Sequence, residues 1–323
     1  MSDGLKWEPR GLIFRTQGQR DWMVSHGCTP TAFALDDDCI RILFAPRNAS
    51  GQSIPSYIDV AADDPSRILA IGERPIMPPG ETGTFDDGGI MPCSVVRRGD
   101  ALYLYFVGWN ASVSVPYRNA IGLAVSHDGG TSFERPFPGA VIDRSRDEPF
   151  FTASPCVVRI GDIWHIWYAS TIRFIEVEGR HEPIYVLMHA RSHDGIEWER
   201  DAAPILPQRH AEEAIARPSV LRTEQGFHLW FCHRGSRDFR DGADSYRIGY
   251  ATSPDGLNWT RRDDDAGPPR TADGFDAHMQ TYPCVIEHRG QLHMFYNGNG
   301  FGREGIGYAR APADALRTSG ARP

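Results

Sequence analysis

The chain has 323 residues, of which 41% are hydrophobic and 24% charged, and it contains 33 glycines and 24 prolines. This length allows two or three ordinary domains or one large all-β or α/β domain, and the composition is typical of a globular protein with a sizeable core. The 34 Lys and Arg residues against 42 Asp and Glu residues give a formal net charge of −8, which argues against general binding of nucleic acid. No run of about 18 apolar residues occurs, so no membrane-spanning helix is expected.

The first ten residues are polar and charged, and they lack the apolar segment of a signal peptide. We therefore expect a cytoplasmic protein with no membrane partner. In that compartment the six cysteines are expected to be reduced thiols and not a disulfide framework. No C-x-x-C pair with the spacing of a zinc site occurs among them. We expect no cofactor. Calcium binding stays open, although no loop of oxygen ligands supports it.

One pattern recurs five times along the chain: a proline, then a small residue and a strand-like apolar run. The intervals between successive prolines are 62, 63, 63 and 65 residues, and the five prolines are Pro30, Pro92, Pro155, Pro218 and Pro283. A short polar turn and a second, aromatic-rich strand follow; in repeats two to five these second strands are 102–106, 164–168, 227–231 and 292–296. A longer variable loop then leads to a third strand, at 121–124, 187–190, 248–251 and 306–309.

An Asp-Gly turn followed by an aromatic residue ends three of the repeats, at 126–133, 192–198 and 253–259. Such turns are hairpin signals, in which the aspartate usually bonds its own turn backbone. Four short strands in each of five repeats predict an all-β, five-bladed β-propeller. The fifth repeat lacks its fourth strand, and segment 5–10 resembles segment 196–200, so the N-terminal strand is predicted to close the last blade. We expect one propeller domain over residues 1–310 and a loose C-terminal tail over 311–323.

The five repeats serve as an internal alignment that separates scaffold from function. The slot after each proline holds only small side chains, which are Thr31, Cys93, Cys156, Ser219 and Cys284. The crowded innermost strand of a propeller requires such side chains, so three of the six cysteines are expected to be core residues. Positions where the repeats diverge into polar residues are expected to contact a ligand instead.

Polar residues gather in two sets of loops, those leading into the first strands and those joining the second and third strands. Antiparallel topology places both sets on one face of the propeller, where a rigid scaffold carries function. The loops leading into the first strands hold the candidate catalytic residues His26, Asp86, Asp87, Glu148 and Glu213. Candidate substrate-binding residues are polar or aromatic and belong to the same face: Arg47, Trp109, Asn110, Arg118, Arg217, Arg234, Tyr246, Arg247, His278, Asn297 and Arg303.

These residue types suit chemistry on a sugar. Two carboxyl groups can divide the acid and base roles in the cleavage of an acetal, and an aromatic ring such as that of Trp109 can stack on a sugar ring. The many arginines are unusual for a neutral substrate, because planar guanidinium groups recognise carboxylate or phosphate. We therefore expect an intracellular ligand that is an anionic or nucleotide-linked sugar, or a biosynthetic glycan intermediate.

The repeat layout, the Ser-x-Asp-Gly turns and the polar loops resemble the five-bladed propeller glycosidases of glycoside hydrolase families 32, 43, 68 and 130. The likeness is strongest to uncharacterised bacterial proteins described as glycosyl hydrolase family 32 N-terminal-like. It covers residues 7–310 and is carried by segments 83–92, 212–218, 246–250 and 295–300. The resemblance implies a five-bladed propeller and a glycoside hydrolase-like activity.

The same resemblance implies roles for single residues. Glu213 fits the general-acid position, and Glu148 or Asp147 fits the carboxylate that tunes it. Families 32 and 43 place an aspartate before the first blade, where this chain has His26, so Asp86, Asp87 or His26 would supply the base. The Trp-Met-Asn-Asp-Pro and Arg-Asp-Pro signatures of family 32 invertases are absent, and fructosidase activity is not expected.

Three functional hypotheses follow. The first is a glycoside hydrolase or a phosphorolytic relative that uses Glu213 with Asp86 or Asp87. The second is an enzyme of another class that acts on an anionic sugar-like metabolite through His26 and the arginines Arg217, Arg234 and Arg247. The third is a non-catalytic carbohydrate-binding propeller. In each, the partner is a small sugar or a glycan and not nucleic acid, and the sequence does not indicate an oligomeric state.

Overall fold

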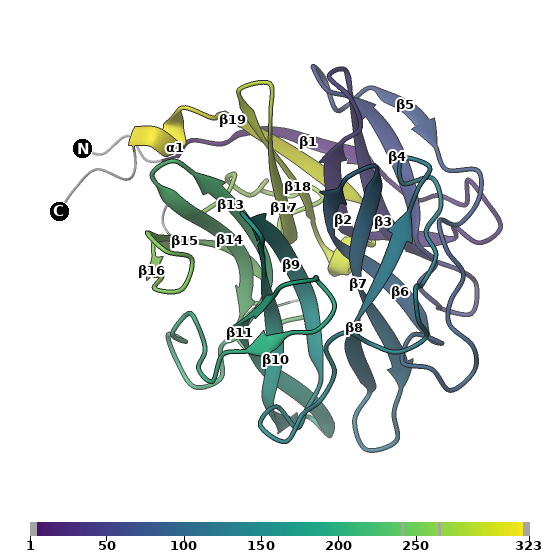
Figure 1. The fold of residues 1–323 in the computed structure, drawn as a ribbon, viewed down its shortest axis with the longest axis vertical. Helices are drawn as coiled ribbons and strands as arrows, with labels where there is room; N and C mark the ends of the chain where they lie inside the picture. Colours follow the sequence, from purple (N-terminus) through teal and green to yellow (C-terminus); the bar gives the residue numbers. More distant parts are fainter. Residues whose placement is uncertain (1–4, 241, 264–265, 319–323) are drawn as a thin grey trace.

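Five β-sheets lie around a common centre in the computed structural model of the chain, which describes residues 5–240, 242–263 and 266–318 (Figure 1). Each sheet is an antiparallel blade whose innermost strand carries one of the five repeated prolines. Blade 1 consists of β2 (Ser25–Ala34), β3 (Cys39–Arg47), β4 (Ser56–Ala61) and β5 (Ile68–Ile71). Blade 2 consists of β6 (Gly89–Arg98), β7 (Ala101–Ala111) and β8 (Tyr117–Ser126). The predicted all-β, five-bladed propeller is confirmed.

The remaining blades follow in chain order. Blade 3 consists of β9 (Thr152–Ile160), β10 (Ile163–Val177), β11 (Arg180–Ser192) and β12 (Glu199–Arg200). Blade 4 consists of β13 (Ala214–Thr223), β14 (Gly226–Arg234), β15 (Arg247–Ser253) and β16 (Thr260–Arg261). Blade 5 consists of β17 (Thr281–His288), β18 (Gln291–Asn297), β19 (Ile306–Pro312) and β1 (Glu8–Phe14). The short helices η2 (Gly300–Gly302) and α1 (Ala315–Thr318) complete the described elements.

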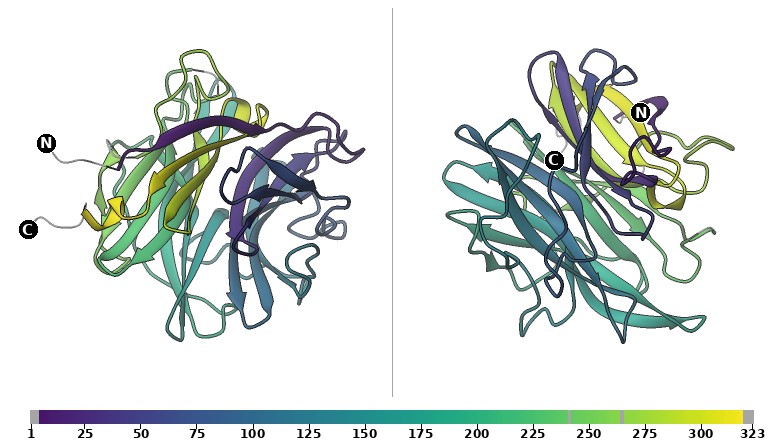
Figure 2. Two further views of the ribbon diagram at one scale, coloured as in Figure 1. Left: turned by 90° about the horizontal axis from the view of Figure 1, so that it is seen from above. Right: turned by 90° about the vertical axis from the view of Figure 1, so that its right-hand side faces the viewer.

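The N-terminal strand closes the ring, as predicted. Strand β1 pairs with β19 in antiparallel register, with Glu8 opposite Arg310, and Figure 2 shows this purple strand beside the yellow strand of the last blade. The chain beyond Arg310 is not loose as far as the structure describes it, because β19 continues to Pro312 and Leu316 is buried in an apolar cluster. Residues 319–323 of the predicted tail lie outside the described residues.

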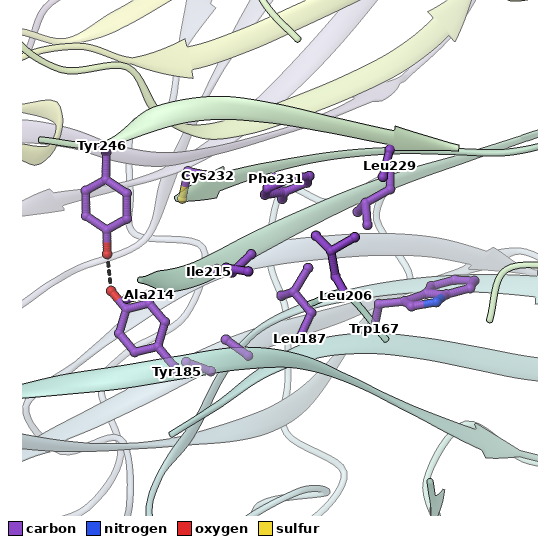
Figure 3. Close-up of a cluster of buried hydrophobic side chains, with 14 of the residues drawn as sticks. Trp167, Tyr185, Leu187, Leu206, Ala214, Ile215, Leu229, Phe231, Cys232 and Tyr246 are labelled. Carbon is purple, nitrogen blue, oxygen red and sulfur yellow. Dashed lines mark hydrogen bonds between the residues drawn. The ribbon is translucent and has the colours of Figure 1, made fainter. Parts of the chain in front are cut away.

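Apolar side chains fill the spaces between neighbouring blades. Figure 3 shows Leu187, Leu206 and Leu229 meeting beside Trp167 between blades 3 and 4. Full burial of one such side chain contributes roughly 1.5–3 kcal/mol, so these contacts hold the blades at fixed positions around the centre. No helix in the described part of the chain is long and apolar enough to cross a membrane.

The small slot residues also join the blades by hydrogen bonds. The backbone amide of Val220 donates to Cys156 Sγ at 3.3 Å, and the amide of Val285 donates to Ser219 Oγ at 2.8 Å. The amide of Ala32 likewise donates to Cys284 Sγ at 3.2 Å. In these three blades the slot residue is therefore small and also accepts a hydrogen bond across the blade boundary, whereas in blade 2 the residue after the slot, Ser94, accepts the corresponding bond from the Val157 amide at 2.9 Å.

The Asp-Gly turns are structural, as expected. In the turn after β8, Asp128 Oδ1 accepts hydrogen bonds from Ser126 Oγ at 2.7 Å and from the amides of Thr131 and Ser132 at 3.0 Å. Burial raises the pKa of Asp128, but the bonds from Ser132, Ser126 and Thr131 outweigh it and lower the pKa to about 2. The aspartate is thus committed to holding its own turn.

Candidate functional site

A cavity of about 470 Å³ lies where the five blades meet, and every blade contributes to its wall. Its volume is in the range of small-molecule sites. Among the described residues that line it, the charged side chains are those of Arg47, Arg234 and Arg240, and none of the lining residues is acidic. Aromatic rings and hydroxyl groups supply much of the remaining wall: Trp109, Tyr117, Tyr185, Tyr246, Tyr282, Phe151, Phe239, Phe301, Thr29, Ser53 and Ser154. This combination favours a ligand that has both a negative charge and a hydroxylated or stacking surface.

Arg234 lines the cavity, is only 2% exposed and is held in place by several hydrogen bonds. Its Nε donates to the hydroxyls of Tyr185 at 3.3 Å and Tyr246 at 3.2 Å, and Nη2 donates to the carbonyl of Pro183 at 2.9 Å. The two tyrosine hydroxyls also hydrogen-bond to each other (Figure 3), and the guanidinium carbon lies 3.8 Å from the centre of the Phe239 ring. Burial lowers the pKa of Arg234, but the tyrosine oxygens outweigh it and raise the pKa above its ordinary value. The charge is held by phenols and carbonyls, and no carboxylate of the described residues pairs with it.

The other two cavity arginines differ in their partners. Arg240 Nη2 lies 2.8 Å from Oε1 of Glu182, a carboxylate that is 5% exposed and sits in the long hairpin of blade 3. Arg47 ends β3, and its buried Nε has no hydrogen-bond partner among the described residues. A buried donor without a partner is costly, so Arg47 is the cavity group with most to gain from an anionic ligand.

His26 lies close to Arg47 but does not line the cavity. Its Nδ1 is 2.8 Å from the hydroxyl of Ser25. Burial first, and then the charges of Arg47 and Arg303, lower the pKa of His26 to about 4. The imidazole is therefore neutral near pH 7 and adds no positive charge to this region.

The three predicted carboxylates on the loops before blades 2, 3 and 4 do not converge. Each is buried and paired with an arginine near the outer edge of its own blade: Asp86 with Arg135 at 2.8 Å, Glu148 with Arg200 at 3.2 Å and Glu213 with Arg261 at 2.7 Å. None of these carboxylates lines the cavity. The pairing recurs in three blades and ties the loop that leads into each blade to the outer edge of that blade, at β12 in blade 3, at β16 in blade 4 and, in blade 2, just after Glu134, which bridges to Val125 of β8.

The surroundings of Glu213 favour its ionised form. A general acid must hold a proton near the working pH. Burial raises the pKa of Glu213, but hydrogen bonds from His233, Arg261 and the Arg209 amide outweigh it and lower the pKa well below its ordinary value. The remaining predicted carboxylate, Asp87, accepts a hydrogen bond from its own loop, and it too is absent from the cavity wall.

The predicted substrate-binding residues divide into two groups. Those that line the cavity are Arg47, Trp109, Arg234 and Tyr246. Arg118 is flanked by two lining residues, and its buried Nε has no partner among the described residues. Most of the others donate hydrogen bonds to backbone carbonyls: Asn110 to Thr84, Arg217 to Pro30, Arg247 to His278 and Asn297 to Gly27. Arg303 is exposed and lies near His26.

Sequence reasoning missed a set of lining residues that directly precede the repeated prolines. Four of these five positions line the cavity, namely Thr29, Met91, Ser154 and Tyr282; the fifth is Arg217. All five differ from one another, and divergence among repeats is the expected mark of a ligand contact. The signal was therefore present two residues before the slot that the alignment singled out, on the other side of each repeated proline.

No three His, Cys, Asp or Glu side chains of the described residues gather in a way that could hold a metal ion. All six cysteines are free, and Cys28 and Cys93 line the cavity. Burial raises the pKa of Cys28 to about 11, so its thiol stays protonated and contributes an uncharged surface.

Comparison with solved structures supports the fold. A glycoside hydrolase from the GH130 family of mannoside phosphorylases superposes with a TM-score of 0.72 at 15% identity, covering 96% of this chain and 95% of that one. A glycosyl hydrolase from Bacteroides ovatus gives 0.70 at 14% identity over 96% and 94% of the two chains. A GH32 β-fructofuranosidase from Bombyx mori gives 0.59 at 14% identity over 88% of this chain and 61% of that one. At these identities the likeness establishes the fold and not the activity.

No family model matches the chain. Two proteins of Mycobacterium tuberculosis are closely similar in sequence: the uncharacterized protein MT1551 of strain CDC 1551 and the uncharacterized protein Rv1502 of strain H37Rv. Each is 38% identical over 308 residues, which span 94% of this chain and 99% of the relative. The chain therefore belongs to the same family as these two mycobacterial proteins, and its fold is that of the glycoside hydrolase-like five-bladed β-propellers.

Proposed function

We propose that this glycosidase-like propeller recognises an anionic sugar, one that carries a carboxylate or a phosphate, in its central cavity. The observation that carries the proposal is the charge of the wall, where Arg47, Arg234 and Arg240 face no acidic lining residue. Guanidinium groups bind carboxylate and phosphate through paired charge-assisted hydrogen bonds. The ring of Trp109, held by a 3.2 Å bond from its Nε1 to Ser53 Oγ, offers a surface on which a sugar ring can stack.

A thermal-shift and calorimetric screen tests this proposal. Sugar acids, sugar phosphates, nucleotide sugars and neutral oligosaccharides are compared, and a ligand at 100 times its Kd stabilises the fold by about 2.7 kcal/mol. We expect hits among the anionic compounds and weaker binding as salt is raised. Binding of neutral oligosaccharides alone would contradict the proposal.

Arg47→Met is the variant that tests whether the anionic ligand binds at the cavity wall. Loss of one charge-assisted hydrogen-bonding group is expected to weaken binding about 10- to 100-fold. The control is Arg67→Met, because Arg67 is exposed, pairs with Asp63 and lies outside the cavity wall. Equal affinity of the two variants for the anionic hit would place the ligand elsewhere.

A second candidate function is cleavage of a glycosidic bond in the same cavity. The observation in its favour is Glu182, a buried carboxylate that pairs with the cavity arginine Arg240. If Glu182 transfers the proton to or from the glycosidic oxygen, Glu182→Gln abolishes turnover of an anionic glycoside and leaves binding intact. A phosphorolytic reaction would also require added phosphate. Retained turnover in Glu182→Gln would exclude that role.

A further inference from the structure

The residue before each repeated proline has an unusual backbone shape in four of the five blades. Thr29, Ser154, Arg217 and Tyr282 have φ values of 53°, 51°, 55° and 54°. Residues other than glycine rarely adopt positive φ, and a residue before proline normally stays extended. The pairing register of the innermost strand shifts at each of these positions. The propeller therefore repeats a strained β-bulge at the same place around its centre.

These bulges aim side chains into the cavity, a known use of bulges beside functional sites. Thr29, Ser154 and Tyr282 all line it. Thr29 is 3% exposed, and its Oγ1 has no hydrogen-bond partner among the described residues. Neither Ser154 nor Tyr282 makes a side-chain hydrogen bond within the described part of the chain. In contrast, the cavity hydroxyl of Tyr246 is already engaged by Arg234.

The fourth bulge closes the centre instead of lining the cavity. Arg217 extends from blade 4 to blade 1, where Nη2 donates to the carbonyl of Pro30 at 2.8 Å and to Thr31 Oγ1 at 2.9 Å. It is almost fully buried. The same bulge thus presents a structural arginine in one blade and hydroxyl side chains that line the cavity in three others. The blades differ in the side chain at this position and not in the bulge.

Hydroxyls and guanidinium groups lie at different depths. In the strand register, Arg47 lies opposite Ser25 at the start of β2, and Arg234 lies opposite Ala214 at the start of β13. Thr29 lies between Cys28 and Thr31, which face Ala45 and Leu43 of β3, so it is about three residues, or roughly 10 Å, from Arg47 along that strand. The positive charges are therefore near the mouth, and the unpartnered hydroxyls are deeper.

We propose that Thr29, Ser154 and Tyr282 form a hydroxyl ring that recognises the hydroxyl pattern of a sugar inserted into the cavity, while the guanidinium groups hold its acidic group near the mouth. The orientation of the ligand in this proposal rests on the proposed binding of an anionic sugar. The hydroxyl ring would contact any sugar that enters the cavity. Burial raises the pKa of Tyr282 well above its ordinary value, so this phenol keeps its proton and can donate it to a ligand oxygen. The ligand class is an anionic monosaccharide unit, such as a hexose phosphate or a hexuronate.

The test removes one hydroxyl at a time and keeps the shape of the side chain, in Thr29→Val, Ser154→Ala and Tyr282→Phe. Calorimetry compares hexose 1-phosphates and hexuronates that differ in the configuration of a single hydroxyl, with inorganic phosphate as the anion alone. We expect the wild type to discriminate between epimers. Each variant should weaken the preferred epimer about three- to tenfold and leave the affinity for inorganic phosphate within about twofold.

A second variant, Ser154→Gly, separates recognition from a structural role. Glycine adopts positive φ without strain, so we expect the unfolding midpoint to rise by about 1–3 °C while the affinity for the preferred epimer falls as it does in Ser154→Ala. A side chain that only serves the fold would not give these opposite changes. Tyr57→Phe, outside the cavity wall, is the control for the tyrosine variant.

The outcomes distinguish the two proposals. If the wild type binds only neutral sugars, the proposed anionic function fails, and the same hydroxyl variants must then weaken neutral binding for the ring to stand. Variants that bind every epimer as the wild type does, or that lose inorganic phosphate equally, overturn the ring alone. A wild-type protein that binds no sugar of either kind overturns both.

Discussion

Glu213→Gln is expected to destabilise the fold without acting on a ligand. The carboxylate is 0% exposed and accepts hydrogen bonds from Arg261 Nη2 at 2.7 Å, Arg209 Nε at 3.0 Å and the Arg209 amide at 2.6 Å. An amide keeps the shape but removes the charge and places two donors among these donors. Loss of one partner of a buried pair costs about 3–5 kcal/mol. Asp263 still holds Arg261 at 2.8 Å and Arg209 at 3.0 Å, so we expect about 3 kcal/mol.

Urea unfolding followed by tryptophan fluorescence measures this change, and Glu212→Gln is the matched control. Glu212 is the preceding residue, its side chain is 31% exposed, and its partner Arg237 is 66% exposed. An exposed pair of this kind contributes less than about 1 kcal/mol. The reasoning is refuted if Glu213→Gln unfolds like the wild type but loses turnover or ligand binding.

The same substitution has a predictable pH dependence. The folded-state pKa of Glu213 lies below its ordinary value of 4.5, so the folded state favours the ionised form more strongly than the unfolded chain does. Its contribution to stability is complete above the unfolded pKa and is lost as the pH falls through the folded pKa. The difference between the wild type and Glu213→Gln should therefore be constant from pH 6 to 8 and shrink below about pH 4.5. A constant difference down to pH 3 would contradict the assigned ion pairs.

Three further predictions concern other buried groups. Burial lowers the pKa values of His26, His228 and His293 to about 4, so the unfolded chain binds more protons than the folded protein between pH 6.5 and 4. The free energy of unfolding, measured with urea, should therefore decrease as the pH falls through this range, by at most about 1.4 kcal/mol per pH unit for each histidine; a free energy that stays constant would argue against neutral buried imidazoles. Burial raises the pKa of Cys156 to about 12, so this thiol should react with a disulfide reagent only after unfolding, and rapid labelling of the folded protein at Cys156 would disprove it. Arg234→Lys loses the planar fork and should weaken binding of an anionic ligand about tenfold or more, whereas unchanged affinity would remove Arg234 from the site.

Much of the fold could be predicted because a propeller repeats its chemistry along the sequence. The five prolines and the Asp-Gly turns identified the blades, and segment 5–10 identified the closing strand. The pattern did not predict the length of each strand. Strands β10 and β11 form a hairpin that continues to Val177 and Arg180, well past the predicted ranges, because pairing extends wherever two neighbouring strands keep facing each other.

The candidate site was predicted only in part, because a sequence places a residue on a loop but does not say which way the side chain points. Arg47 and Arg234 end second strands, so their side chains reach the cavity. Glu213 lies on a predicted loop, but its side chain turns toward Arg261 in the outermost strand. The repeats did hold this information, since an arginine follows two residues after Phe133, Trp198 and Trp259 in three blades. Reading each acid together with that arginine would have predicted their ion pairs.

The balance of charge in the cavity leads to one more prediction, on Arg47. Arg234 donates hydrogen bonds to two phenol oxygens and Arg240 pairs with Glu182, whereas the Nε of Arg47 has no partner among the described residues. Burial first, and then the charge of Arg47, lowers the pKa of His26. Arg47→Met should therefore leave the unliganded fold as stable as before or slightly more stable, raise the pKa of His26 in an NMR titration, and weaken binding of an anionic sugar. A residue kept for stability would show the reverse, with a fall in the unfolding midpoint and unchanged affinity. Because the three readouts have independent signs, they separate a guanidinium kept for a ligand from one that holds the propeller together.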